Sequence, residues 1–472
     1  MPKLALPRFA PPPLTPMILA VALFMEQMDS TVIATSLPAI AQDLGTSPIA
    51  LKLAVTAYLV ALAIFIPISG WVSDRIGAKS VFRAAIGVFV LGSIACAFAN
   101  SIHAFVLARF LQGMGGAMMT PVGRLLLVRG TPRAELVSAM AWLTIPALMG
   151  PILGPLLGGF LTTYLSWHWI FWINVPIGAA GIVLVTRFLP ESPPLPTRPI
   201  DLPGFGLTAA ALGGLVLGLS LVSLPALPAG WGYGALALGA AAGLAYLRHA
   251  RTAAHPLLDL ALLRHPLFRA GILGGSLFRV GVGAIPFLLP LMLQLGFGLS
   301  PFQSGLVTFV AAIGAISSKV FAARTFRAFG FRRVLWAGSL VSAGLIAVNA
   351  AFTPATPTAL IMGLLLLGGV LRSLCFTGVN AMVFADVPEA ETSQATAINA
   401  VCQQVSLATG VALGGGVLDL AASRHGGEIA LGDFHLAFLA VAGVASLAAL
   451  SFGRLPPDAG AAVSGHRPAP AE

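Results

Sequence analysis

Residues 53–79, LAVTAYLVALAIFIPISGWVSDRIGAK, decide the class of this protein. Residues 53–71 carry no charge, and an uncharged helix of that length crosses the hydrocarbon core of a bilayer. Charges appear only at the end of the stretch, where Asp74, Arg75 and Lys79 are expected in a short connection. Since 57% of the 472 residues are hydrophobic and 9% are charged, the same pattern should fill the chain. The sequence therefore predicts an all-α membrane protein.

Apolar runs long enough to cross a bilayer recur on both sides of this stretch. An even number of spans places both termini on one side of the membrane. We predict fourteen transmembrane helices, at 16–38, 50–71, 80–99, 102–124, 135–163, 167–189, 202–224, 231–250, 267–295, 301–321, 332–352, 358–385, 393–420 and 434–453.

The two longest connections, 189–201 and 251–266, bracket two spans of mostly Gly, Ala and Leu, which divides the helices into six, two and six. A faint internal repeat supports the division, because the loops 74–79 and 327–332 share a glycine followed by a cation. The predicted parts are a cytoplasmic N-terminal tail at 1–15, an N-terminal six-helix bundle at 16–189, a linker with two additional transmembrane helices at 190–266, a C-terminal six-helix bundle at 267–453 and a cytoplasmic tail at 454–472.

The positive charges indicate the orientation, because cytoplasmic connections are enriched in Lys and Arg. With both termini in the cytoplasm, only Lys52 and Arg424 lie in outer connections. The acidic connection 386–392 is an exception on the inner side, with Asp386, Glu389 and Glu391 and no cation. Nineteen of the 26 cations lie in cytoplasmic segments: Lys3, Arg8, Arg75, Lys79, Arg83, Arg129, Arg133, Arg187, Arg198, Arg248, Arg251, Arg264, Arg269, Arg324, Arg327, Arg332, Arg333, Arg454 and Arg467.

Other functional classes find little support in the sequence. The net charge of +10 is spread over many short loops, so we expect no nucleic-acid partner. The three cysteines lie in apolar spans without metal-ligand spacing, and no phosphate-binding loop is present, so we expect no metal and no cofactor.

Four segments form a series in a fixed order. Segment 23–38 is LFMEQMDSTVIATSLP, segment 70–79 is GWVSDRIGAK, segment 109–117 is RFLQGMGGA, and segment 150–159 is GPILGPLLGG. Together they resemble the first-helix signature, loop motif, fourth-helix motif and fifth-helix antiporter motif of the major facilitator superfamily, and within it the fourteen-span drug:proton antiporter family. The resemblance implies a major facilitator fold and secondary transport.

The first of these segments carries two acids, Glu26 and Asp29, inside an apolar span. Because charging a carboxylate in hydrocarbon is costly, Asp29 should face a cavity, a partner or both. At about 1.5 Å per residue, Asp29 and Arg109 lie at similar depths, roughly 18 Å from the inner end and roughly 10 Å from the outer end of their spans. We predict proton coupling by Asp29, Glu26 and Arg109. The alternative is a permanent ion pair that never titrates.

The loop motif predicts conformational gating. Asp74, Arg75 and Lys79 could latch the two halves in one state, while Gly70 and Gly77 permit close approach and a sharp turn. The alternative is a solvated loop that obeys the orientation rule. The antiporter motif should leave a groove and a bendable backbone for tight helix packing, through Gly150, Pro151, Gly154, Pro155, Gly158 and Gly159.

Deeper cations in the second half bear on the substrate. Arg279 and Arg372 lie roughly 16 Å and 21 Å into their spans, too far from a surface to reach it easily. Such cations would make the cavity electropositive, which suits anions. The alternatives are pairing with helix C-termini and hydrogen bonds between helices. The residues predicted to contact substrate are Arg279, Arg372, Lys319, Gln403 and Asn399.

These features predict a multi-pass, monomeric protein of the bacterial inner membrane that exports small molecules in exchange for protons, as in multidrug efflux. Its partners are the substrate, protons and the lipid bilayer. The alternative within transport is export of an anionic metabolite such as citrate or a metal chelate. A membrane sensor without flux would usually carry a soluble output domain, and a membrane enzyme would need a catalytic cluster, whereas His168, His249, His255 and His265 fall at helix ends and loops.

Overall fold

The structure is a computed structural model that describes residues 14–131, 136–194, 199–222, 228–388, 391–426 and 428–466. Within these ranges all regular secondary structure is helical, which confirms the predicted all-α class. Six charged residues that the sequence analysis assigned to cytoplasmic segments lie outside the described residues: Lys3, Arg8, Arg133, Arg198, Glu389 and Arg467.

The N-terminal half begins with helices whose bounds follow the apolar runs closely. Ser101 caps the longest of them by accepting a hydrogen bond from the Ala104 amide at 3.3 Å. The helices of this half are α1 (Leu14–Val32), α2 (Leu37–Asp43), α3 (Lys52–Phe65), α4 (Ser69–Ile76), α5 (Ala78–Ala97), α6 (Ile102–Gly130), α7 (Leu136–Tyr164), α8 (Trp169–Trp172) and α9 (Asn174–Phe188).

Two further helices, α10 (Leu202–Val222) and α11 (Ala229–Thr252), form a hairpin in the middle of the chain. Their glycines bring the two backbones together, since a Cβ on Gly214 would lie 2.7 Å from the Cα of Gly239. Helix α10 also contacts α3 and α15. The hairpin therefore packs along the seam between the two halves.

The C-terminal half differs from the sequence prediction at one connection. A loop was expected between spans 301–321 and 332–352, but α13 continues to Gly330, where φ of 73° and ψ of 164° break the helix at a single residue. Phe326 and Phe331 on either side are buried, so packing keeps this region helical. The helices of this half are α12 (Pro266–Leu291), α13 (Pro301–Val348), α14 (Thr358–Met382), α15 (Thr392–Ala422), α16 (Leu431–Ser446), α17 (Ala448–Gly453) and α18 (Ala461–Ser464).

Judged by length and composition, fewer helices qualify as membrane spans than the fourteen predicted. In the described residues ten helices are long and apolar enough to cross a membrane, and α13 counts as one of them. Helices α6, α7 and α11 are not among the ten. In α6 and α11, Gly, Arg and other less apolar residues lower the mean hydropathy. The fourteen-helix count is thus not confirmed, whereas a multi-pass helical membrane protein is.

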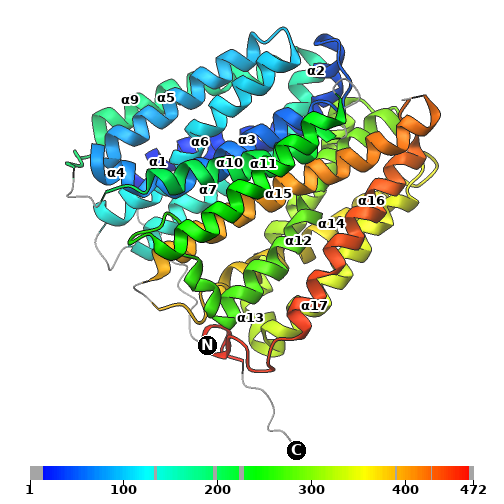
Figure 1. Ribbon diagram of the computed structural model, residues 1–472. Coiled ribbons are helices and arrows are strands. Elements are labelled where there is room, and N and C mark those ends of the chain that lie inside the picture. Colours follow the sequence, from blue (N-terminus) through cyan, green and yellow to red (C-terminus); the bar gives the residue numbers. More distant parts are fainter. Residues whose placement is uncertain are drawn as a thin grey trace, which may run out of the picture.

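The main hydrophobic core that joins the two halves lies at one end and includes Leu37, Phe105 and Phe171 with Phe287 and Phe434. A smaller cluster joins α3 to α15 through α10. Away from that end, each half has a cluster of its own. Figure 1 shows the same arrangement, since the two groups of helices converge near α2 and diverge toward α4 and α17.

We name the joined end the outer end, because the charge distribution predicts that it faces away from the cytoplasm. Hydrogen bonds cross between the halves there. The Gln294 side chain donates to the Thr35 carbonyl at 2.9 Å, and the Phe302 amide donates to the Thr163 hydroxyl at 3.1 Å. The halves are therefore closed against each other at the outer end.

Candidate functional site

Asp29 lies at the centre of a buried polar cluster in the N-terminal half. It has 0% exposure on α1, and Arg109 of α6 donates to its carboxylate at 2.7 Å. Gln112, one turn after Arg109, and Asn174 at the start of α9 each donate to the second carboxylate oxygen at 2.8 Å. The depths estimated from the sequence do bring Asp29 and Arg109 together. With three donors, the ionised form of Asp29 is well compensated in this conformation.

Arg109 is held in place by more than its acid. Its guanidinium lies over the Tyr58 ring of α3, 4.4 Å from the ring centre, and it also donates to Gln112 at 2.7 Å. Asn174 donates to Ser93 of α5 at 3.0 Å, which fixes the amide. The cluster therefore joins α1, α3, α5, α6 and α9, and a change in the charge of Asp29 acts on all five helices.

Glu26, one turn before Asp29, occupies a different environment. It accepts a hydrogen bond from Thr120 of α6 at 2.6 Å and lines a cavity of about 250 Å³ between the two halves. Tyr58 and Arg109 also line this cavity, whereas Asp29 is not among the residues described around it. Glu26 is thus the carboxylate in contact with the cavity, and Asp29 lies behind Arg109.

The cavity lining mixes apolar and hydrogen-bonding groups from both halves. In this conformation its charged side chains are one acid, Glu26, and one cation, Arg109. The expectation that cations would dominate it is therefore wrong for the residues that the structure describes. The lining residues are Glu26, Gln27, Ser30, Thr31, Ile33, Ala34, Leu37, Val55, Tyr58, Leu59, Leu62, Arg109, Val282, Gly283, Pro286, Phe287, Gln403, Gln404, Leu407 and Val411.

The gating-loop residues form contacts inside the N-terminal half. Asp74 pairs with Arg129 of α6 at 2.6 Å, and Lys79, only 3% exposed, donates to Glu191 and to the Leu189 carbonyl, each at 2.7 Å. The hydrogen bond and charge of Lys79 hold the pKa of the exposed Glu191 carboxyl below its ordinary value. The predicted latch across the two halves is not among these ion pairs.

The two glycines of this loop have different surroundings. Gly77 adopts φ of +99°, and a Cβ there would collide with the Ser192 carbonyl oxygen, so the sharp turn requires glycine. A Cβ on Gly70 would meet no atom within 4 Å. The close approach expected at Gly70 is therefore wrong. Arg75 is exposed at the end of α4.

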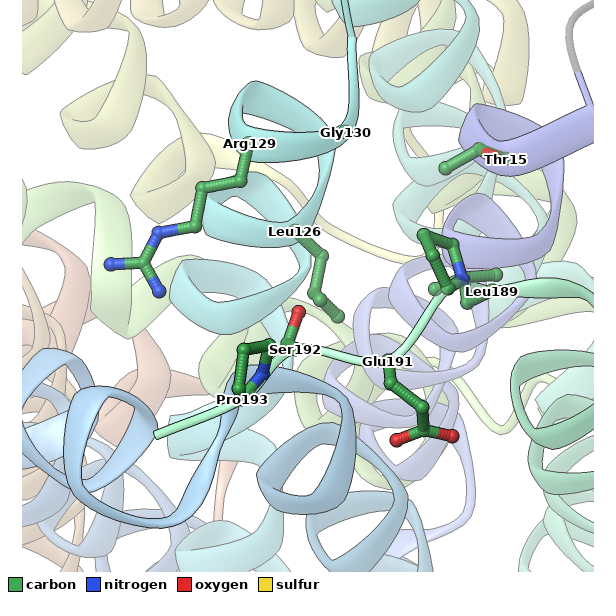
Figure 2. Close-up of a pocket in the computed structure, with 9 residues that line it drawn as sticks. Thr15, Leu126, Arg129, Gly130, Leu189, Glu191, Ser192 and Pro193 are labelled. Carbon is green, nitrogen blue, oxygen red and sulfur yellow. The ribbon is translucent and has the colours of Figure 1, made fainter. Parts of the chain in front are cut away.

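A hollow of about 260 Å³ lies beside this loop, where segment 189–193 crosses the ends of α1 and α6. Figure 2 shows the Arg129 guanidinium and the Glu191 carboxylate pointing away from each other. Each charge is paired elsewhere, Arg129 with Asp74 and Glu191 with Lys79. The hollow is thus bordered by charges that are already compensated, and it marks the place where the linker docks on the gating loop.

The antiporter motif packs α7 closely against α1. A Cβ on Gly150 would lie 2.7 Å from the Met28 amide nitrogen, and a Cβ on Gly158 would lie 2.7 Å from the Thr35 hydroxyl. Gly159 faces the other half instead, with Pro301 and Phe302 of α13 as its neighbours. These glycines therefore let the helix that carries Asp29 approach α7 at backbone distance. The motif prolines, Pro151 and Pro155, lie inside α7.

Arg279 of α12 is the buried charge of the C-terminal half. It has 0% exposure and donates from Nη2 to the side-chain oxygens of Asn380 at 2.8 Å and Asn399 at 3.1 Å. Its guanidinium lies 5.3 Å from the centre of the Phe376 ring. The Nε and Nη1 atoms have no hydrogen-bond partner among the described residues. Arg279 therefore keeps donors available in an environment where an unpaired donor is costly.

The other predicted substrate contacts lie apart from the cavity, with one exception. Arg372 folds along α14 over Gly368, whose Cβ would lie 2.9 Å from its Nη1, and Lys319 donates to Thr377 at 2.5 Å. Only Gln403 of the five lines the cavity. The structure thus places Arg279, Arg372 and Asn399 within the helix packing of the C-terminal half, and Lys319 on its exposed surface.

The acidic connection that broke the charge rule has a structural explanation. Asp386 accepts hydrogen bonds from the Leu267 and Phe268 amides at 2.7 and 3.1 Å, which caps the start of α12. Glu391 pairs with Arg264 at 2.5 Å and His265 at 2.9 Å. Because these acids bind the cations and amides of a neighbouring connection, their negative charge is locally compensated.

Sequence reasoning did not assign roles to Gln112, Asn174 and Tyr58. Gln112 follows Arg109 by three residues, so it shares a helix face with it. Asn174 is an amide in an otherwise apolar segment. Both patterns mark polar groups that need partners in a membrane, and they are the signals that would have identified the cluster.

The comparisons with known proteins agree with this fold. The sequence profile of the Major Facilitator Superfamily matches residues 19–250 and 271–471. A protein of Klebsiella pneumoniae (strain 342) named "Putative multidrug resistance protein MdtD" is 38% identical over 449 residues, which cover 94% of each chain. The protein of that name from Salmonella heidelberg (strain SL476) is 38% identical over 455 residues, which cover 93% of this chain and 94% of the relative.

Among solved structures, the crystal structure of a D-xylose-proton symporter superposes with a TM-score of 0.69. The two sequences are 16% identical, and the match covers 94% of this chain and 98% of the symporter, so it supports the fold alone. The profile match and the relatives confirm the resemblance drawn from the four motifs. The chain therefore belongs to the Major Facilitator Superfamily and is a multi-pass membrane transporter of small molecules rather than an enzyme.

Proposed function

We propose that this transporter exports small molecules in exchange for protons, by alternating access of the central cavity to the two sides of the membrane. The observation that carries this proposal is the Asp29–Arg109 pair, at 0% and 1% exposure. Protonation of Asp29 removes the charge that holds Arg109, Gln112 and Asn174 in place. The five helices tied together by the cluster then become free to repack.

The position of Glu26 supplies the route by which a proton reaches this pair. Glu26 contacts the cavity, while Asp29 lies behind Arg109. A proton that enters through the cavity therefore meets Glu26 first, and neutral Glu26 no longer attracts the cavity-lining Arg109. In this scheme Glu26 receives the proton first, and protonation of Asp29 then lets the helices repack.

The cavity supports a broad substrate range. Its walls combine apolar side chains such as Leu59, Leu62 and Phe287 with the amides of Gln403 and Gln404. Apolar contact with a few hydrogen-bonding groups is typical of sites for varied organic molecules. The relatives are named for multidrug resistance, and multidrug efflux is the activity proposed for this chain.

We extend the proposal to topology. Counting α13 as two spans on either side of Gly330, and adding α6, α7 and α11 to the ten apolar helices, gives fourteen. The separate inner cores support a division into two bundles at 16–189 and 267–453, with the α10–α11 hairpin between them. We place the protein in the bacterial inner membrane as a monomer, with both termini in the cytoplasm.

Flux into inverted membrane vesicles tests this function. A proton gradient should drive uptake of a cationic dye by the wild type. Asp29→Asn should abolish that uptake, because the amide cannot titrate, while expression is retained. Asp458→Asn, at an exposed acid outside the spans, is the matched control and should transport normally. Wild-type dye uptake by Asp29→Asn under a proton gradient would show that the coupling assignment is wrong.

Arg279 favours a second candidate function, export of an anionic metabolite such as citrate or a metal chelate. Its Nε and Nη1 atoms are buried and unpartnered among the described residues, and carboxylates are the natural acceptors for such donors. In the same vesicles, Arg279→Ala should reduce uptake of citrate and leave uptake of the dye unchanged. Equal loss of both substrates would instead indicate a structural role for Arg279.

A further inference from the structure

Lys52 is a fully buried lysine at the outer end of the molecule. It is the first residue of α3, has 0% exposure, and is one of the two cations that the sequence places in outer connections. Burying an ammonium group is costly unless a negative charge or strong acceptors compensate it. Its burial therefore calls for an explanation that the orientation rule does not give.

The Lys52 side chain lies against the other half of the molecule. A Cβ on Gly415 of α15 would lie 2.7 Å from the Cδ of Lys52 and 3.5 Å from its Cβ, so the absence of a side chain at Gly415 makes room for the lysine stem. Phe287 of α12 closes the same space, 3.2 Å from that Cβ position. The stem thus runs in a groove built by the C-terminal half.

Asp419 supplies the negative charge. It follows Gly415 by four residues, one helical turn nearer the end of α15, so the two residues share a helix face. The Asp419 carboxylate is half-buried and lies close enough to Lys52 for the two opposite charges to attract each other. Helix α3 belongs to the N-terminal half and α15 to the C-terminal half. The pair therefore spans the seam between the halves at the end where they are closed.

We propose that Lys52 and Asp419 form an electrostatic latch that holds the outer end of the cavity closed and must separate whenever the transporter opens outward. This inference rests on the proposed alternating access. Opening would draw Lys52 out of its groove at Gly415 and place both charges in water, where their attraction is weak. With Lys52 buried and Asp419 half-buried, their attraction favours the closed state, and removal of either charge shifts the population toward the outward-open state.

Thiol accessibility in intact cells measures this population directly. Val55 lines the cavity on α3, one turn inward from Lys52, so a cysteine there reports opening from outside. A membrane-impermeant maleimide should label Val55→Cys slowly. Adding Lys52→Met or Asp419→Asn should raise the labelling rate about fivefold or more. The protein without Val55→Cys gives the background from native cysteines, and Arg424→Gln, at the exposed outer cation, should leave the rate unchanged.

Charge exchange separates a latch from a packing effect. Lys52→Asp combined with Asp419→Lys should return labelling close to the rate of Val55→Cys alone, although each single reversal raises it. The latch is refuted if the neutral variants label at the unmodified rate, or if the exchanged pair labels as fast as the single reversals. Lys52→Met keeps the length of the stem, and Asp419→Asn tests the pair from the other side should one variant fail to fold.

The labelling assay needs neither substrate nor a proton gradient, so it can fail independently of the proposed transport. Adding Asp29→Asn to Val55→Cys should block flux. A further Lys52→Met in that protein should still raise the labelling rate. A latch without flux would refute the proposed function alone. Normal flux with no response to charge removal would refute the latch alone.

Discussion

Each half has a charge of 0% exposure on its first helix, Asp29 on α1 and Arg279 on α12, and the two charges have different partners. Asp29 of α1 is bound by a guanidinium and two amides, whereas Arg279 of α12 is bound by two amide oxygens and an aromatic face. Partners come from the fourth helix in both halves, Arg109 and Gln112 from α6 and Asn380 from α14. Both oxygens of the Asp29 carboxylate accept hydrogen bonds, and Arg109 leaves only its Nε atom unpartnered, whereas Arg279 leaves both Nε and Nη1 without a partner among the described residues.

The difference suggests that the two charges have separate roles in transport. A charge whose partners are all internal responds to its own protonation, so it suits coupling. A charge with spare donors responds to a ligand that brings acceptors, so it suits recognition. The following predictions test whether the two charges differ in this way.

Arg109→Met should have the largest effect on stability. It leaves the Asp29 carboxylate buried at 0% exposure with amide donors only, and breaking such a pair costs about 3–5 kcal/mol. Thermal or denaturant unfolding of the purified protein in detergent measures this loss. The double variant Arg109→Met with Asp29→Asn removes the stranded charge and should recover most of the stability. A single variant as stable as the wild type would contradict the closed charge pair.

Arg279→Met should behave in the opposite way. Since no buried carboxylate among the described residues depends on Arg279, its removal strands only the amide oxygens of Asn380 and Asn399, and we expect a change within about 1 kcal/mol. The same unfolding assay measures it. A loss of stability as large as that of Arg109→Met would show that Arg279 has an acidic partner inside the protein. The contrast between the two halves would then disappear.

The sequence predicted the contact between Asp29 and Arg109, whereas it did not predict the surroundings of Arg279 and Arg372. Asp29 and Arg109 could be matched because depth along a helix follows from residue number alone. The roles of Gln112 and Asn174 depend on how each helix is rotated about its axis, which packing decides. For the same reason, the folding of Arg372 along its own helix over Gly368, rather than toward the cavity, could not be predicted from the sequence.

The loops show the same limit. The repeat of glycine and cation at 74–79 and 327–332 was visible, and both Gly77 and Gly330 adopt positive φ, +99° and +73°. Yet the acid that pairs with Lys79 comes from the linker, at Glu191, which no local pattern indicates. Contacts between segments distant in sequence are where prediction from the chain alone fails.

The two loop glycines allow a smaller test of the comparison between halves. Gly77→Ala should cost about 1–2 kcal/mol, because an alanine with φ of +99° is strained and its Cβ meets the backbone oxygen of Ser192. Gly330→Ala should cost less, since the nearest atoms belong to the His466 side chain, which can move. Gly70→Ala, inside a helix and in open space, should be neutral or stabilising by about 0.5–1 kcal/mol. Thermal unfolding ranks the three, and a different order would contradict these surroundings.

Asp201 gives the smallest and most selective test, because its partners among the described residues are two backbone amides and a histidine. It accepts hydrogen bonds from the Gly204 and Leu257 amides at 2.9 and 3.1 Å and from His249 at 2.6 Å, which ties the start of α10 to the end of α11. Burial alone would raise the pKa of the Asp201 carboxyl, but these hydrogen bonds outweigh burial and lower the pKa below its ordinary 3.8.

Because the folded-state pKa is depressed, the contribution of Asp201 is present above pH 3.8 and disappears as the pH falls through the folded-state pKa. Asp201→Asn should therefore cost about 1 kcal/mol at neutral pH and progressively less in acid. Unfolding measured from pH 7 down to pH 3 checks the sign. A difference between wild type and variant that stayed constant over this range would contradict a lowered pKa of Asp201 in the folded state, because a carboxylate that binds protons equally in both states contributes no pH dependence.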